Sequence, residues 1–334
     1  YTQAGTPNVK ASWTYDEANR TLNLTLSQKT KPTRDQKEKL PFYMPIRISF
    51  LDPEGHDVHP AELSSSGFIV LKEESQTYSF TLDKGTLPVI LRDFSAPVKL
   101  DASYTTEELQ HMLSFCDDAF IKVDSAQTMQ KRYVHENIKL LEQGGTLKDP
   151  VELVESYKAL LKSVDKKTDL LLLNETLKIM PVASLMETFD DDIDIDAISR
   201  LHNELEQRVA VALEKEFYEI YGRIKAQSVM YSVIDMSRRA ISNSALHMLS
   251  VAYVATGKAD HAAAVVVRHC NSSANMTDKR QALTDAAHLN LKCKQELLKS
   301  FEKDYSKNAL AFDNYFRVQA TVPDVSAFDI VNEL

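Results

Sequence analysis

Proline is distributed unevenly along the chain. Eight of the eleven prolines lie within residues 1–97, and only Pro150, Pro181 and Pro323 follow. Because proline lacks a backbone donor and interrupts helices, this shift predicts a change of secondary structure and a domain boundary near residue 100.

The first hundred residues alternate apolar and polar side chains. The clearest runs are 22–26, 46–50 and 78–82. Alternation with a period of two places one face of a strand in a core. These segments therefore predict β-strands.

Turn-forming residues separate the strand segments. Residues 52–55 (DPEG) and 83–85 (DKG) are typical of short loops between antiparallel strands. The charged segment 30–40 carries no periodicity and predicts a solvated loop. We predict an antiparallel β-sandwich domain over residues 1–100.

From residue 105 onward the apolar spacing becomes helical. Thr105 and Glu108 form a capping-box pattern, and Asp149 before Pro150 predicts a second helix start with Asp149 as its N-cap. An apolar stripe over 194–222 predicts one helix that ends near Gly222.

Further helix-length segments follow, with breaks near 257, 271–273 and 308. No strand segment accompanies them, and no clear repeat period is visible. We predict an α-helical superhelical array over residues 101–334. The fold class is mainly α with an N-terminal all-β domain.

Composition excludes several functions. The formal net charge of −9 and a pI near 5.5 argue against nucleic-acid binding, and no apolar run is long enough to suggest a membrane span. Cys116, Cys270 and Cys293 are too few and too scattered for a disulfide framework. We expect a reducing, cytoplasmic location.

Both ends of the sequence resemble cuts in a longer chain. It begins at Tyr1 with neither methionine nor a signal-peptide pattern, and an apolar stripe over 325–334 stops without a C-cap signal. We expect the chain to be a fragment.

The histidines do not predict a zinc site. The sequence contains no H-E-x-x-H motif, and His135-Glu136 lacks the second histidine one turn later. His261 and His269 are eight residues apart and could share a helix face near Cys270, but a further ligand would have to come from elsewhere.

Acidic and glycine-rich motifs are equally incomplete. The carboxylates of 190–196 resemble a calcium loop, yet with Asp192 at position 1 the required Gly and Glu are replaced by Ala197 and Asn203. A helix N-terminus explains the run. Phosphate-binding and nucleophile-elbow motifs are absent from the sequence. We therefore expect no catalytic, cofactor-binding or metal-binding residues in this chain.

Five segments resemble the bacterial aminopeptidase N family, a family of zinc metalloaminopeptidases. They occur in the family's order along nearly the whole chain. They are 1–7 (YTQAGTP), 24–30 (LTLSQKT), 93–100 (DFSAPVKL), 275–278 (NMTD) and 313–320 (DNYFRVQA).

The resemblance implies a parent enzyme of four domains, of which this chain would be the third, a β-sandwich, and most of the fourth, a helical domain truncated at its C-terminus. In the family, zinc is held by H-E-x-x-H and a downstream Glu, and a G-x-M-E-N segment binds the substrate amine. No position here matches either motif. The resemblance thus implies zinc in the parent enzyme, none in this chain, and no activity of the chain alone.

The roles that the resemblance leaves to the chain are structural. It would support the parent's catalytic domain within the same polypeptide and wall the cavity in which peptide substrates lose their N-terminal residues. The alternative is a free-standing scaffold whose helical array binds a peptide or protein on a concave face. Neither reading involves nucleic acid or a membrane.

Overall fold

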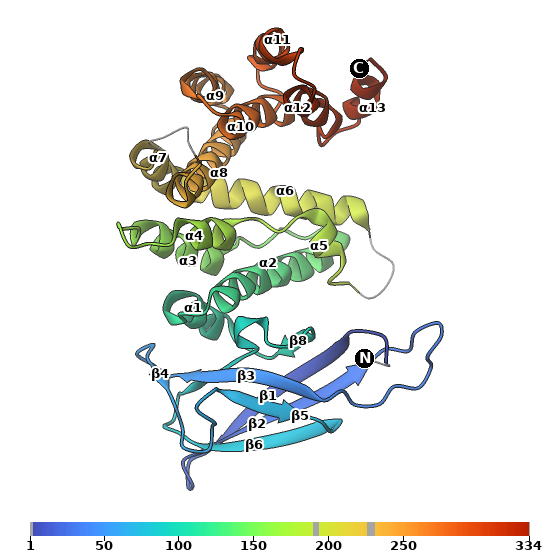
Figure 1. The fold of residues 1–334 in the computed structure, drawn as a ribbon, viewed down its shortest axis with the longest axis vertical. Helices are drawn as coiled ribbons and strands as arrows, with labels where there is room; N and C mark the ends of the chain where they lie inside the picture. Colours follow the sequence, from blue (N-terminus) through green and yellow to red (C-terminus); the bar gives the residue numbers. More distant parts are fainter. Residues whose placement is uncertain (1–2, 190–193, 226–230, 334) are drawn as a thin grey trace. The chain divides into compact units, whose positions relative to one another are not determined.

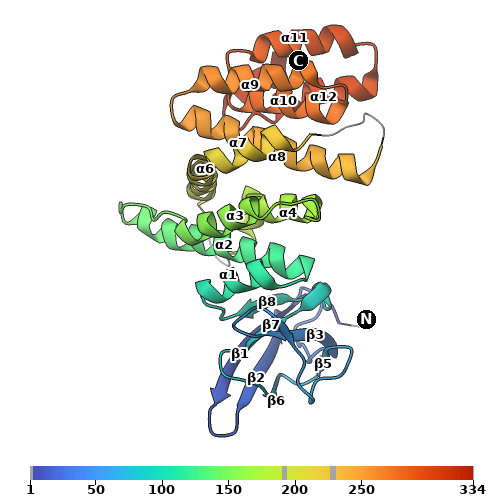
Figure 2. The same cartoon turned by 90° about the vertical axis from the view of Figure 1, so that its left-hand side faces the viewer.

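The computed structural model describes residues 3–189, 194–225 and 231–333. The chain divides into two compact units, Tyr1–Met129 and Gln130–Leu334. This division falls inside one long helix, whereas the domain boundary at residue 100 stays a prediction. Figures 1 and 2 show the elements of each unit from two directions.

The N-terminal unit contains two β-sheets. One has the strand order β6-β2-β1-β8, and in the other β3 pairs with β4, β5 and β7. All strand pairs are antiparallel except β1 with β8, which is parallel. The strands are β1 (Pro7–Asp16), β2 (Thr21–Thr30), β3 (Met44–Leu51), β4 (Asp57–Val58), β5 (Phe68–Leu71), β6 (Ser75–Thr81), β7 (Leu87–Ile90) and β8 (Lys99–Ala102).

The apolar residues of the predicted alternating pattern form a core between the two sheets. Leu22, Leu24 and Leu26 of β2 are buried in one apolar cluster with alternate residues of β3. The rings of Phe50 on β3 and Phe80 on β6 are 4.8 Å apart, so the two sheets meet face to face. The predicted sandwich fold is therefore confirmed.

Turns occur where the sequence predicts them. The chain turns at Gly55, whose φ of 87° favours glycine. A Cβ atom there would lie only 2.3 Å from the Phe115 ring, so the position requires glycine. The predicted loop over 30–40 contains one isolated bridge, between Thr33 and Gln36.

After β8 the described chain is helical, which confirms the predicted fold class. A short 3-10 turn, η1 (Arg92–Phe94), precedes β8. The helices are α1 (Thr106–Phe115), α2 (Ala119–Glu142), α3 (Val151–Lys162), α4 (Leu170–Leu177), α5 (Val182–Met186), α6 (Ile195–Ala212), α7 (Glu214–Arg223), α8 (Val233–Ala255), α9 (Ala259–Ser272), α10 (Met276–His288), α11 (Lys294–Tyr305), α12 (Ala309–Ala320) and α13 (Ser326–Glu333).

Two predicted helix boundaries are wrong. Pro150, not Asp149, is the N-cap of α3, because its ψ of 56° lies outside the helical region and the Asp149 carboxylate pairs with Arg208 of α6. The stripe over 194–222 is divided at Leu213, which leaves helical geometry with φ −112° and ψ 18°. The chain turns there because α7 packs on α3 and α8.

The second half of the helical unit has a continuous apolar core. Figure 2 shows α9, α10, α11 and α12 stacked beside one another. Small residues such as Ala262, Ala282 and Ala286 allow these helices to approach closely, and Leu283 and Phe301 fill the space between them. Among the described helices, none has the length and apolarity that a membrane span requires.

Candidate functional site

The histidine of the incomplete His135-Glu136 zinc motif contacts other side chains. His135 of α2 is half-buried, and its Nε2 lies 2.8 Å from the Thr188 hydroxyl. Its ring stacks on Phe189 at 4.0 Å between centroids. Burial lowers the pKa of His135. These contacts explain the side chain without a metal.

The other histidines do not converge either. His269 of α9 is buried, with Nδ1 3.1 Å from the Tyr221 hydroxyl. His261 lies near the Tyr253 ring, with centroids 6.0 Å apart. Over residues 3–189, 194–225 and 231–333, no group of three His, Cys, Asp or Glu side chains is placed to hold a metal ion.

The described part of the acidic run, Asp194 and Asp196, lies at the start of a helix. Asp190, Asp191 and Asp192 fall outside the described residues. Asp194 is the N-cap of α6 and accepts a hydrogen bond of 2.9 Å from the backbone N–H of Ala197. For this residue, the interpretation as a helix N-terminus is confirmed.

A charged cluster of Glu206, His247 and Asp285, here called the His247 cluster, joins three helices. His247 of α8 directs Nδ1 to Asp285 Oδ1 of α10 at 2.8 Å and Nε2 to Glu206 Oε1 of α6 at 3.1 Å. An ionised carboxylate accepts and does not donate, so with both partners ionised each ring nitrogen carries a hydrogen. The ring is therefore an imidazolium.

The electrostatics agree with this protonation state. Burial alone would lower the pKa of His247, but the charges of Asp285 and Glu206 and their hydrogen bonds raise it well above its usual value. Burial opposes the shift at Glu206, whose pKa is lowered by the hydrogen bond from His247. Asp285 is fully buried, whereas 31% of the His247 side chain is exposed.

The exposed part of His247 faces a pocket of about 230 Å³, here called the His247 pocket. Its wall combines apolar and polar side chains from α4, the segment after α4, and α6, α7, α8 and α10. The apolar members are Leu177, Ile179, Phe217 and Met248, and the polar ones include Asn174, Lys178, Glu206, Ser244, Gln281 and Thr284.

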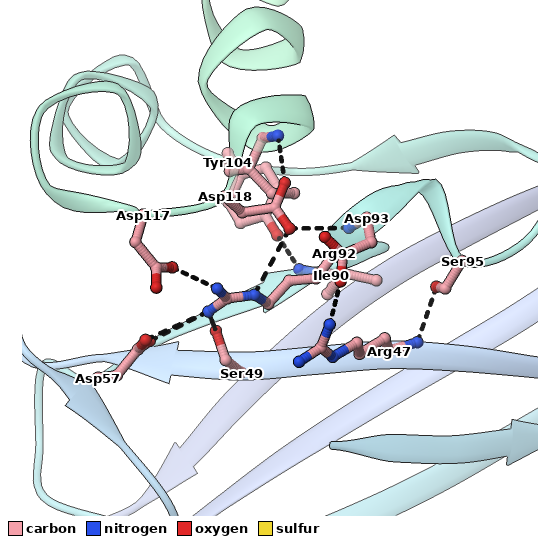
Figure 3. A network of polar contacts seen from close by, with 11 residues as sticks. Arg47, Ser49, Asp57, Ile90, Arg92, Asp93, Ser95, Tyr104, Asp117 and Asp118 are labelled. Atoms are coloured by element: carbon pink, nitrogen blue, oxygen red, sulfur yellow. Dashed lines mark hydrogen bonds and ion pairs between the residues drawn. The ribbon is translucent and has the colours of Figure 1, made fainter. Parts of the chain in front are cut away.

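A second charged cluster lies in the N-terminal unit and is shown in Figure 3. The Arg92 cluster consists of Ser49, Asp57, Arg92, Asp117 and Asp118. Nη1 of Arg92 donates to the Ser49 hydroxyl at 2.7 Å and to Asp57 at 3.2 Å, while Nη2 pairs with Asp117.

Asp118 is the buried member of the Arg92 cluster. It lies 3.7 Å from Arg92 Nε and accepts backbone hydrogen bonds from Asp93 at 2.8 Å and from Ile121 at 2.9 Å. Asp93 itself has a φ of 53°, and Leu91 one of 72°. The cluster therefore holds an unusual backbone turn after β7.

A more open hollow of about 300 Å³ lies beside Trp13 and Tyr15. Glu108 on its wall is engaged with the N–H of Thr105 at 2.7 Å, and Nε2 of His111 lies 2.8 Å from the Asp52 carbonyl. These polar groups serve the local backbone. The His247 pocket is thus the stronger candidate site.

The sequence did not reveal the His247 cluster. Its members are separated by 41 and 38 positions along the chain. The available signal was a charged residue on a helix face that is otherwise apolar. Asp285 stands between Leu283 and the pair Ala286 and Ala287, all of which are buried.

Comparison with known proteins decides the family. Residues 106–334 match a family described as a domain of unknown function (DUF3458_C) with ARM repeats. The chain belongs to the DUF3458_C family. Residues 5–103 match the companion domain of unknown function DUF3458, described as an Ig-like fold.

Two curated relatives of this DUF3458_C chain are named Aminopeptidase N. The protein from Haemophilus influenzae (strain ATCC 51907 / DSM 11121 / KW20 / Rd) is 34% identical over 339 residues, and that from Escherichia coli (strain K12) is 29% identical over 341. Each match covers 100% of this chain and 38% of the relative's length. They confirm the resemblance seen in the sequence.

A solved structure shares the fold. The structure titled "Crystal structure of Legionella pneumophila aminopeptidase A in complex with aspartic acid" aligns with a TM-score of 0.82 and 17% identity. It matches 99% of this DUF3458_C chain and 37% of that chain. At this identity the likeness establishes the fold alone.

Proposed function

We propose that this chain is the non-catalytic part of a zinc aminopeptidase that releases N-terminal residues from peptides. The proposal rests on how much of this chain, and how much of each relative, the sequence matches cover. Relatives named Aminopeptidase N match all 334 residues, while the chain spans only 38% of their length. The remainder of such a protein would supply the catalytic domain.

Within the residues that the structure describes, the side chains do not fit a zinc ion. The sequence contains no H-E-x-x-H motif, and His135 and His269 each contact another side chain. We therefore assign the zinc to the catalytic domain of the longer protein. Its role is to support that domain and to wall the cavity through which peptides enter.

Exposed apolar side chains support a docking role. In the described part of the helical unit, Leu310, Val325 and Phe328 expose 84%, 85% and 78% of their surface. Exposed apolar side chains that gather in one patch mark surfaces that another protein covers. We also propose a cytoplasmic location, which the three free cysteines favour.

Complementation tests the proposal. The upstream part of the longer protein and this chain are expressed separately, and activity is measured on aminoacyl substrates and on peptides of increasing length. We expect activity only with the upstream part, and a changed dependence on peptide length once this chain is added. An upstream part whose stability and length preference do not respond to this chain would refute the walling role.

Metal analysis gives a second test. After dialysis, we expect this chain alone to retain no stoichiometric zinc and to cleave no aminoacyl substrate. One retained zinc per chain that is lost in His135→Ala or His269→Ala would place a metal site in this chain and overturn the proposal.

A further inference from the structure

We propose that the His247 pocket binds a small organic cation, namely a primary ammonium group attached to a short apolar chain. The inference is independent of the function proposed above, because it rests only on the charge, hydrogen-bonding capacity and size of this pocket.

The first argument is charge. The His247 cluster contains two carboxylates, Glu206 and Asp285, and one imidazolium, so its formal charge is negative. Lys178 also lines the pocket, but its ammonium group is paired with Glu175 and adds no net charge. A pocket with unbalanced negative charge favours a cation.

The second argument is hydrogen bonding. Three lining residues can still accept hydrogen bonds. Glu206 has a second carboxylate oxygen, and Gln281 retains its carbonyl oxygen because its Nε2 donates to Asp285 at 2.9 Å. Ser244 retains its lone pairs because its hydroxyl donates to Asn174 at 2.7 Å. An ammonium group has three donors and no acceptor. The acceptors of the pocket therefore complement the donors of an ammonium group.

The same lining residues argue against an anion or a metal ion as the ligand. An anion would need several donors, yet both ring N–H groups of His247 already point to carboxylates and the Lys178 ammonium is paired. Only single amide N–H groups of Asn174 and Gln281 remain, and neither carries a positive charge. A metal ion would need several converging ligands, and no such group of three occurs within the described residues.

The third argument is size and polarity. Leu177, Phe217 and Met248 provide the apolar part of the pocket lining. The volume of about 230 Å³ equals that of about eight waters at roughly 30 Å³ each. It is smaller than a drug-sized site of about 300–1,000 Å³. A short branched alkylammonium ion matches both the volume and the mixed wall.

The test uses the full chain and three probes that share a branched alkyl group and are similar in size: isopentylammonium, isopentanol and isovalerate. Binding is followed by the methyl resonance of Met248 in protein with labelled methionine methyl groups, assigned with Met248→Leu. We expect isopentylammonium to shift this resonance saturably and to bind at least about tenfold more tightly than the alcohol or the acid, a difference of about 1.4 kcal/mol. Equal binding of the alcohol would reduce the site to an apolar cavity and overturn the proposal, as would the absence of saturation.

Variants locate the charge that binds. Glu206→Gln should weaken isopentylammonium binding about tenfold or more, and Ser244→Ala, which retains the His247 cluster, by a smaller factor. The matched control is Glu204→Gln on the same helix, because Glu204 pairs with Arg208 and does not line the pocket. Unchanged affinity in both Glu206→Gln and Ser244→Ala, with the native spectrum retained, would refute the assignment.

Discussion

The Arg92 cluster and the His247 cluster both compensate a buried carboxylate with one positive charge, but they use different side chains to do so. Each places one cation among carboxylates, at least one of which is almost fully buried: Asp118 is 1% exposed and Asp285 0%. The Arg92 side chain is only 11% exposed, whereas that of His247 is 31% exposed and borders a pocket.

The chemistry of the two cations explains the difference. A guanidinium stays charged at every physiological pH and offers several donors in a fixed plane, which suits a permanent link between backbone segments. An imidazolium loses its charge in an accessible pH range. The N-terminal unit therefore contains a fixed link, and the helical unit contains one that can be altered by pH or by a ligand.

Removing the fixed cation should have the largest effect. We expect Arg92→Met to lower the free energy of unfolding by about 3 kcal/mol, since Asp118 keeps its backbone donors but loses its buried counter-charge. Urea unfolding followed by the fluorescence of Trp13, the only tryptophan, reports on this unit.

The control for Arg92→Met is an exposed ion pair in the same unit. Lys10 and Asp101 lie 3.8 Å apart with side chains 74% and 70% exposed. Lys10→Met should change the unfolding free energy by less than about 1 kcal/mol. If the two variants had equal effects, burial would not be what distinguishes the Arg92 cluster.

Removing the titratable cation should cost less. At neutral pH we expect His247→Gln to destabilise the chain by about 2 kcal/mol, because Asp285 remains buried without a counter-charge while water can reach Glu206 from the pocket. Far-UV circular dichroism during urea unfolding measures the helices. The exposed His261, changed to Gln, is the control; a comparable loss there would contradict the role given to the cluster.

The two clusters should differ most clearly in their response to pH. The folded-state pKa of His247 is raised above the usual 6.5, so its stabilisation is complete below about pH 6.5 and is lost as pH rises through the folded pKa. The pKa of Glu206 is lowered from 4.5, so its contribution is lost only toward acid pH. The stability difference between wild type and His247→Gln should therefore shrink at alkaline pH.

Arg92→Met is the reference for that pH series. Its stability difference from wild type should stay constant over the same alkaline range, because the guanidinium does not titrate there. An NMR titration of the His247 ring gives the pKa directly. A His247 pKa at or below 6.5 would remove the basis of the expected pH dependence.

Features that depend on neighbouring residues could be predicted from the sequence. The alternation over 22–26 predicted β2, and the spacing of Thr105 and Glu108 predicted the observed capping box of α1. Even the family-like segment 275–278 has a local explanation, since Asn275 caps α10 and exchanges hydrogen bonds with Asp278. Short-range hydrogen bonds and side-chain periodicity suffice for such elements.

Features that depend on distant residues could not be predicted. Asp149 looked like an N-cap, but Arg208, which is 59 positions away, takes its carboxylate. The apolar stripe over 194–222 keeps a helical spacing across Leu213, so nothing in the pattern marked the break. The His247 cluster arises only when α6, α8 and α10 pack together, and therefore no single segment carries its signature.

The smallest predicted effects compare helix caps in the two units. The Thr105 hydroxyl accepts from the Glu108 N–H at 3.2 Å, and the Asn275 side chain accepts from the Asp278 N–H at 3.0 Å. We expect Thr105→Ala and Asn275→Ala each to cost about 1 kcal/mol, read by Trp13 fluorescence and by far-UV circular dichroism respectively. Because Asp278 also accepts from Asn243 of α8 at 3.0 Å, losing Asn275 loosens a contact between helices as well as a cap.

Conservative variants separate the contribution of the cap acceptor from that of the side-chain hydrogen bond to Asp278. Thr105→Ser keeps the hydroxyl and should restore most of the stability, since the capping box needs only that acceptor. Asn275→Ser also keeps a cap acceptor but cannot reproduce the 2.6 Å hydrogen bond from Asn275 Nδ2 to Asp278 Oδ2. Its rescue should therefore be incomplete. Full rescue in both would mean that the Asp278 carboxylate contributes nothing beyond the cap, and that the helix starts of the two units are held in the same way.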